Sequence, residues 1–213
     1  MKNLNEYVIE RLKINKGISP IKYNYHPKDF KELRSLIEQL LDERGKDADL
    51  NNIDVSNITA FYENFENKGL FEDLDPHNIK IDKWNVSNVK DMRYIFCDCK
   101  NFNCNLENWD VSNVEDMNCM FIDCKKFIGQ GLDKWNVSNV KDMAFMFDGC
   151  YNFNCNLSNW NVSNVENMKF MFCGCEKFTG QGLENWKPLK YPYMNYMFDG
   201  CTSLKNKPSW YKG

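Results

Sequence analysis

Histidine is almost absent from this chain of 213 residues, in which His26 and His77 are the only two. Because no histidine follows residue 77, the later part of the chain cannot form the Cys–His or Ser–His pairs that activate a nucleophile. A phosphate-binding glycine loop is also missing, since neither GQG segment continues into Lys-Ser or Lys-Thr. These absences predict a protein that is not an enzyme and that needs no cofactor.

The chain also lacks an excess of either charge and any long apolar run. Its 27 basic and 30 acidic residues give a net charge of −3, so we expect no nucleic-acid contact except as part of a bound ribonucleoprotein. The segment MKNLNEYVIERLKINKG has no apolar core or small-residue cleavage site, and no later stretch is apolar enough to cross a bilayer. The sequence therefore predicts a cytoplasmic protein with no membrane contact.

One phrase is instead repeated four times with small changes. It runs WNVSNVKDMRYIF from Trp84, WDVSNVEDMNCMF from Trp109, WNVSNVKDMAFMF from Trp135 and WNVSNVENMKFMF from Trp160. Together with a tryptophan at 186, the copies begin alternately 25 and 26 residues apart. Self-similarity at a short, fixed period predicts a stack of coils, each of which buries its apolar face against its neighbours.

Positions counted from the tryptophan, as offset 0, show which residues the coils require. Apolar residues recur at offsets 2, 5, 8, 11 and 12, and a cysteine follows at offset 15. One coil supplies Val111, Val114, Met117, Met120, Phe121 and Cys124. A weaker first coil has Ile53 in the tryptophan position, followed by Val55, Ile58, Phe61 and Phe65. The pattern predicts an α/β repeat solenoid of about six coils.

Each coil is expected to combine short helical turns with short parallel strands. The segment DMxxMFxxC suits one or two helical turns that begin at an aspartate N-cap, namely Asp91, Asp116 or Asp142. The flanking NLxNW and VSNV segments are short enough to be extended and to pair with the next coil. The glycines at 129, 131, 180 and 182 suit the extra residue of the longer coils, because glycine permits sharp turns.

The first fifty residues follow a helical pattern. Leu4, Val8 and Leu12 lie at helical spacing, and a second helix is expected to start at Pro27 and to end at Gly45. Its apolar face would comprise Phe30, Leu33, Ile37, Leu40 and Leu41. We expect residues 1–50 to cap the stack, because a solenoid exposes apolar surface at its ends. Residues 51–213 then form the repeat region, which ends in a proline-containing coil.

The ten cysteines are expected to be reduced, and no metal site is expected. Five of them occupy offset 15, as buried apolar fillers would: Cys99, Cys124, Cys150, Cys175 and Cys201. The CDC and CGC pairs lie three coils apart, on the order of 15 Å at strand spacing, which is too far for one zinc ion. A calcium ladder along the aspartates is less favourable than N-capping, because a capping carboxylate already accepts backbone hydrogen bonds.

A column of residues at or near offset 10 is aromatic except at one position. It comprises Tyr62, Tyr94, Cys119, Phe145, Phe170 and Tyr196, and it is called the aromatic column below. These rings either pack between coils or form a stripe suited to a partner protein, because rigid aromatics are favoured at interface centres. The predicted partner-binding residues are the five aromatic members of the column and two neighbouring cations, Arg93 and Lys169.

The string W-[DN]-V-S-N-V-x-[DN]-M-x-x-M-F-x-x-C-x-x-F resembles the BspA-like repeat family, or mycoplasma lipoprotein-type repeat, over about residues 51–204. The resemblance implies leucine-rich-repeat-like coils that bind proteins, and it supplies no catalytic residues. Many members of that family are surface proteins that bind host molecules, whereas this sequence shows no export signal. Its front end, with YHPKDFKELRSLIEQLL, is similar to short signal-less members encoded by gut bacteria and their phages or mobile elements.

Taken together, the sequence predicts a non-enzymatic protein–protein interaction scaffold. If the resemblance to mobile-element members holds, the partner is a bacterial defence protein, which the chain inhibits by occlusion. Two alternatives stay open at this point. An adhesin-like surface module would contain oxidised cysteines, and a metal-binding repeat protein would contain zinc or calcium in a fixed ratio.

Overall fold

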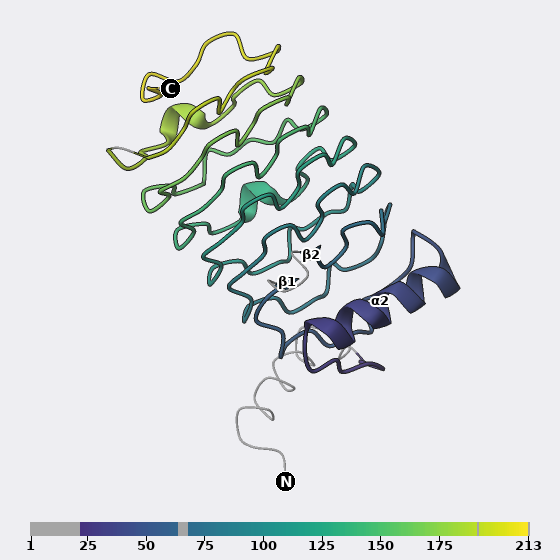
Figure 1. The fold of residues 1–213 in the computed structure, drawn as a ribbon. Helices are drawn as coiled ribbons and strands as arrows, with labels where there is room; N and C mark the ends of the chain where they lie inside the picture. The colour runs from purple at the N-terminus through teal and green to yellow at the C-terminus, as the bar shows by residue number, and fades with distance from the viewer. Residues whose placement is uncertain (1–21, 64–67, 191, 213) are drawn as a thin grey trace, which may run out of the picture.

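The computed structural model describes residues 22–63, 68–190 and 192–212, in which the chain winds into coils stacked side by side (Figure 1). Successive coils are joined at one column of isolated parallel bridges. The bridged residues are Ala60, Asp91, Asp116, Asp142, Asn167 and Tyr193. The named elements are one helix, α2 (Phe30–Arg44), a two-stranded antiparallel sheet of β1 (Tyr62–Glu63) and β2 (Lys68–Gly69), and two 3-10 helices, η1 (Leu132–Lys134) and η2 (Leu183–Asn185).

Between offsets 8 and 14, every second peptide donates its N–H to a carbonyl of the following coil. In the coil of Trp109 the donor–acceptor pairs are Met117–Asp142, Cys119–Ala144, Phe121–Met146 and Asp123–Asp148, at 2.7–2.9 Å. The peptides between them close turns within the coil, as where Met120 N–H donates to Met117 O at 3.2 Å. The backbone groups of this irregular segment are thus paired without an α-helix or a long strand, as burial requires.

This arrangement corrects two expectations about the coil. Asp91, Asp116 and Asp142 do not begin helical turns, because the residues after them form consecutive turns and bond to the next coil. Their carboxylates accept the N–H two residues ahead, for example Asn118 N–H to Asp116 Oδ1 at 2.9 Å. The parallel bridges also fall at these aspartates and at their counterparts, whereas the sequence favoured the NLxNW and VSNV segments.

The two longer coils place their extra residue before a 3-10 helix. Gly131 and Gly182 precede η1 and η2 with φ of 88° and 91°, in the left-handed region that favours glycine. A Cβ on Gly131 would collide with the backbone of Glu107 in the neighbouring coil. Glycine is required here both by the backbone angle and by the close approach of two coils.

The core is built from columns of identical residues in register. Trp109 donates its Nε1–H to Ile81 O at 2.9 Å, and the same bond joins each other coil tryptophan to the preceding coil at 2.7–3.0 Å. Trp210 makes this bond too, so the end of the chain continues the column beyond Trp186. The phenylalanines at offset 12 stack along the axis, with Phe121 and Phe147 centroids 5.6 Å apart. The predicted core residues Val111, Val114, Met117, Met120 and Phe121 are buried.

Helix α2 lies across the first coil, at the end of the stack opposite the C-terminus (Figure 1). Its N-cap is Asp29, whose carboxylate accepts Glu32 N–H, so the helix starts at Phe30 and the expected start at Pro27 was wrong. Leu33, Ile37, Leu40 and Leu41 are buried, and Gly45 ends the helix with φ of 84°. The expected helix around residues 4–12, and Phe65, lie outside the described residues.

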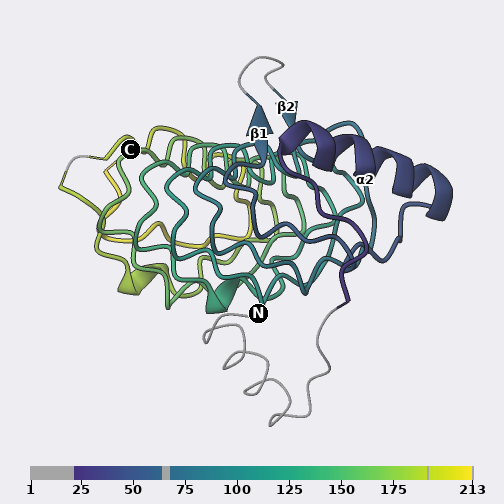
Figure 2. The ribbon, with the colours of Figure 1, turned by 90° about the horizontal axis from the view of Figure 1, so that it is seen from below.

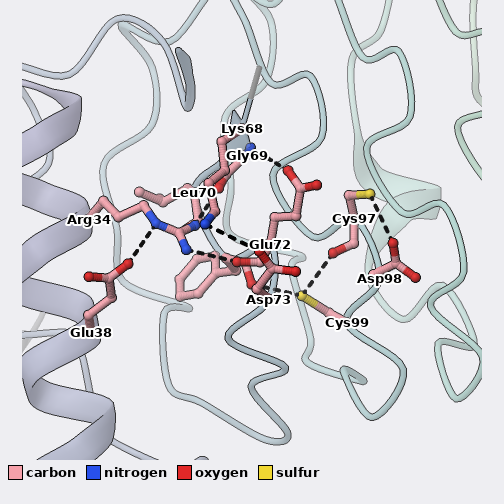
Figure 3. Close-up of polar contacts among 11 residues, drawn as sticks. Arg34, Glu38, Lys68, Gly69, Leu70, Glu72, Asp73, Cys97, Asp98 and Cys99 are labelled. Carbon is pink, nitrogen blue, oxygen red and sulfur yellow. Dashed lines mark hydrogen bonds and ion pairs between the residues drawn. The ribbon is translucent and has the colours of Figure 1, made fainter. Parts of the chain in front are cut away.

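Arg34 anchors α2 to the first coil through the backbone (Figure 3). Its guanidinium donates to the carbonyls of Gly69, Leu70 and Glu72 at 2.6–2.9 Å and to Glu38 Oε1 at 2.9 Å. The residue is 6% exposed. A buried cation is tolerated where its donors are satisfied, so Arg34 both fixes the helix and satisfies carbonyls at the end of the stack.

The β1–β2 hairpin projects from one side of the stack, and the two 3-10 helices lie on the opposite side (Figure 2). Tyr62 belongs to this hairpin, which places the start of the aromatic column on the side away from η1 and η2. No helix among the described residues is long and apolar enough to cross a membrane.

Candidate functional site

Five of the six members of the aromatic column have a backbone conformation that their side chains disfavour. Tyr94, Cys119, Phe145, Phe170 and Tyr196 all have φ between 55° and 57°. Left-handed φ is uncommon for residues other than glycine, asparagine and aspartate, and it costs about 1–2 kcal/mol for a residue with a Cβ. The N–H of each of these residues except Tyr196 donates to the next coil, so these left-handed residues lie within the inter-coil ladder.

A second left-handed column in the same coils provides a comparison. Offset 14 also has positive φ, and it is occupied by aspartate or glycine: Asp98, Asp123, Gly149, Gly174 and Gly200. These residue types tolerate the left-handed region. The aromatic column thus has bulky rings where local preference calls for glycine, so an interaction of the rings must compensate for the backbone strain.

Part of that compensation is stacking along the column. Phe145 and Phe170 lie with ring centroids 4.8 Å apart at 8°, and Phe170 and Tyr196 lie 5.0 Å apart at 23°. Parallel stacks of this kind contribute about 0.5–1.5 kcal/mol per pair beyond burial. Phe145 and Phe170 are partly exposed and Tyr196 is 61% exposed, so the three rings form a ribbon with one edge in solvent.

Cys119 divides the column into two clusters. On its N-terminal side Tyr62 and Tyr94 stack at 5.4 Å, and on its C-terminal side lie the three rings just described. The hydroxyl of Tyr94 hydrogen-bonds to the Cys119 thiol, and burial together with this thiol raises the pKa of Tyr94. Burial raises the pKa of Cys119 to about 11, so the thiol stays protonated and is a poor nucleophile.

Arg93 completes the N-terminal cluster. Its guanidinium lies over the Tyr62 ring, 4.2 Å from the centroid, and donates to the carboxylate of Asp91 at 2.6–3.1 Å. Hydrogen bonding to Asp91 raises the pKa of Arg93. The predicted residues Tyr62, Arg93 and Tyr94 therefore form one contiguous group, in which Tyr62 is only 8% exposed.

The aspartates at offset 7, three residues before the aromatic column in each coil, form a column of polar groups. Asp91 is paired with Arg93, and Asp142 accepts a hydrogen bond from the Asn167 amide at 2.9 Å. Asp116 lies between them, 3.6 Å from Arg93 Nε. Burial and the charges of Asp142 and Asp91 raise the pKa of Asp116 to about 6. The middle carboxylate is therefore destabilised in its charged form.

The C-terminal cluster contains one exposed residue that the sequence analysis missed. Lys169, which was predicted, lies over the ring of Tyr193 with its Nζ 5.0 Å from the centroid. Tyr193 is 64% exposed and pairs with Asn167 in the bridge column. A signal was present, because residue 193 stands at offset 7, where the preceding coils have aspartate or asparagine.

No group of three or more His, Cys, Asp and Glu side chains within 22–63, 68–190 and 192–212 is arranged to hold a metal ion. His26 pairs with Asp54 at 3.3 Å, in the part of the chain next to α2. Each offset-15 thiol points to a carbonyl of the preceding coil, as Cys150 Sγ does to Phe121 O at 2.9 Å, and burial raises the pKa of Cys150 well above its ordinary value.

Comparison with known proteins identifies a family. A family model described as "Mycoplasma protein of unknown function, DUF285" matches residues 32–131 and 123–212. The two matches together extend from the first turn of α2 to the end of the last coil. No curated protein and no solved structure matches the chain.

Proposed function

The chain belongs to this mycoplasma-type repeat family, and we propose that it is a protein-interaction scaffold that binds a partner through the aromatic column. We assign the stack, as part of this proposal, to the leucine-rich-repeat-like solenoids with an N-terminal helical cap. The proposal takes the chain to act without catalysis or a metal. It also takes the chain to be a cytoplasmic protein of the mobile-element type, whose partner is a bacterial defence protein that it occludes.

The observation that carries the proposal is the strained position of exposed rings. Phe145, Phe170 and Tyr196 stand at left-handed positions where aspartate or glycine would serve the backbone better, as they do at offset 14. Stacking compensates only partly, because one edge of the ribbon stays in solvent. A few residues dominate the binding free energy of most protein interfaces, and rigid aromatics such as Tyr196 are favoured among them.

The test separates binding from stability by the choice of substitution. A partner is first recovered from the native cell with tagged protein, and its affinity is then measured for wild type and for Phe145→Gly with Phe170→Gly. Glycine removes the rings and also relieves the left-handed strain, so folding should be nearly unchanged. We expect affinity to fall by at least about thirtyfold, which corresponds to a hot-spot loss of about 2 kcal/mol.

A matched control changes polar residues on another side of the coils. Ser112→Ala with Ser163→Ala alters half-buried positions in the VSNV turns, and it should leave both the affinity and the melting temperature near wild-type values. Full affinity of the double-glycine variant would exclude the column as the binding surface. In that case the partner contacts must be sought on another side of the stack.

A further inference from the structure

The last coil leaves the inter-coil ladder unfinished. In the preceding coils the N–H groups at offsets 8, 10, 12 and 14 donate to the next coil. The equivalent donors in the last coil are Met194, Tyr196, Phe198 and Gly200, and none has an acceptor among the described residues. Met194 and Phe198 are buried, whereas Tyr196 and Gly200 are exposed. The C-terminal end of the stack therefore presents a row of donors, of which two face solvent.

This edge differs from that of an ordinary β-sheet because it offers only donors over this segment. An ordinary strand edge alternates N–H and C=O groups, whereas here every ladder peptide points the same way. Aligned peptide dipoles make the last coil the positive end, as at the N-terminus of a helix. Two copies of the chain cannot pair through this edge, since each would present donors to donors. The occupant must supply acceptors.

The charge of the same region also favours an anionic occupant. Residues 187–213 contain five lysines and one acidic residue, Asp199, in a chain whose net charge is −3. Lys207 lies over the ring of Tyr211, with its Nζ 5.0 Å from the centroid. A basic part of the chain thus coincides with the donor-only end of the ladder.

The end of the stack is also hollowed. One hollow of about 660 Å³ is lined by Tyr193, Asn195, Trp210 and Lys212 among others, and a second of about 360 Å³ by Asn195, Tyr196 and Lys207 among others. They meet at Asn195. Tyr196 ends the aromatic column, so the face of its ring opposite Phe170 has no described ring against it. We call this region, formed by residues 189–190, 192–200 and 207–212, the terminal face.

We propose that the terminal face docks an acidic, extended segment of a partner protein. Carbonyl groups of that segment accept hydrogen bonds from the Tyr196 and Gly200 amides, its carboxylates pair with Lys207 and Lys212, and its backbone lies against Tyr196 and Trp210. This continues the ladder by one more strand, as in the addition of a peptide to an exposed sheet edge. The inference deepens the proposed function, on which it rests, by giving the chemistry of one bound segment.

The experiment uses the whole chain and a labelled peptide of alternating Glu and Gly, with a peptide of alternating Lys and Gly as the charge control. We expect fluorescence anisotropy to show binding of the acidic peptide alone, weakening as salt rises. Lys207→Glu with Lys212→Glu should reduce affinity at least about tenfold, because two attractive pairs become repulsive. In amide NMR spectra, titration with the peptide should shift Tyr196 and Gly200 most.

The control variant, Lys100→Glu with Lys126→Glu, makes the same change of charge on exposed lysines of earlier coils, and it should bind like wild type. Equal losses in both variants would show a nonspecific charge effect and overturn the proposal. Equal binding of single-stranded DNA would overturn the choice of a protein segment. Self-association abolished by the terminal variant would assign the face to a second copy. If the acidic peptide does not bind the wild-type chain, while partner affinity still depends on Phe145 and Phe170, this inference is refuted and the proposed function stands.

Discussion

The rings of Phe145 and Phe170 stack 4.8 Å apart at 8°, and both residues hold a left-handed backbone of φ 55–57°. Both residues also donate their N–H to the next coil, so the ladder that sets the spacing of the coils runs through these left-handed positions. Stacking between coils partly offsets the strain of their backbones. The solvent-facing edges of the Phe145 and Phe170 rings are available to a partner.

The strain makes an unusual prediction for stability. At Phe145, substitution by glycine should leave the protein more stable than substitution by alanine, by about 1 kcal/mol, because alanine keeps the left-handed cost and glycine does not. At Phe147, which is buried and has no positive φ, alanine should be the better tolerated of the two. Urea unfolding of the four variants measures both differences. If glycine and alanine rank in the same order of stability at both positions, the backbone of Phe145 is not strained.

Arg34 should be far more important than other cations of α2. Arg34→Met removes the donors of three backbone carbonyls and of Glu38, and we expect the free energy of unfolding to fall by about 3–5 kcal/mol, because each carbonyl left without a donor inside the protein costs about 1–3 kcal/mol. The control is Arg44→Met, on the same helix, whose side chain is exposed and donates to Asp49 O and Tyr25. The free energy of unfolding of Arg44→Met should fall by less than about 1 kcal/mol. Equal midpoints for the two variants in urea would show that Arg34 does not anchor the helix.

Asp116 should make stability depend on pH. Its pKa is raised from 3.8 to about 6, so between these values the folded protein binds more protons than the unfolded chain and stability falls as pH rises. Above pH 6 the penalty is constant, and after solvent screening it is about 1 kcal/mol. Asp116→Asn, which copies the residue found at Asn167, should raise the melting temperature at pH 7.5 and flatten the profile between pH 4 and 6. Equal pH profiles for wild type and Asp116→Asn would show that the carboxylate is not destabilised.

The cysteines should differ in reactivity according to burial. Cys173 is the one described cysteine that is not buried, so it alone should react with a thiol reagent in the native protein. The reaction should be slow near neutral pH, because burial and Asp148 raise the Cys173 pKa to about 11. After unfolding under an alkylating quench, all ten cysteines should titrate as thiols. Recovery of disulfides would contradict the reduced state, and Cys173→Ser is the control for the native signal.

The sequence alone was sufficient to determine the period of the coils and the residues that face inward. The spacing of Val111, Val114 and Met117 predicted burial that the structure has, because an in-register repeat must place equivalent side chains in equivalent positions. The apolar face of α2, from Leu33 to Leu41, was equally evident from helical spacing. Three residues separated its expected start from Phe30, since both Pro27 and Asp29 are plausible at a helix N-terminus.

Only the tertiary structure determined how the peptides between offsets 8 and 14 are oriented. Side-chain periodicity shows which residues are buried, but it does not show which way each peptide plane points, and that depends on carbonyls of the next coil, 25 or 26 residues away. The bridge at Asp116 follows from that long-range pairing, and so does the amide of Tyr196, which has no acceptor among the described residues. The donor-only end of the stack therefore came from contacts between coils, because a single coil supplies the donors and its neighbour supplies the acceptors.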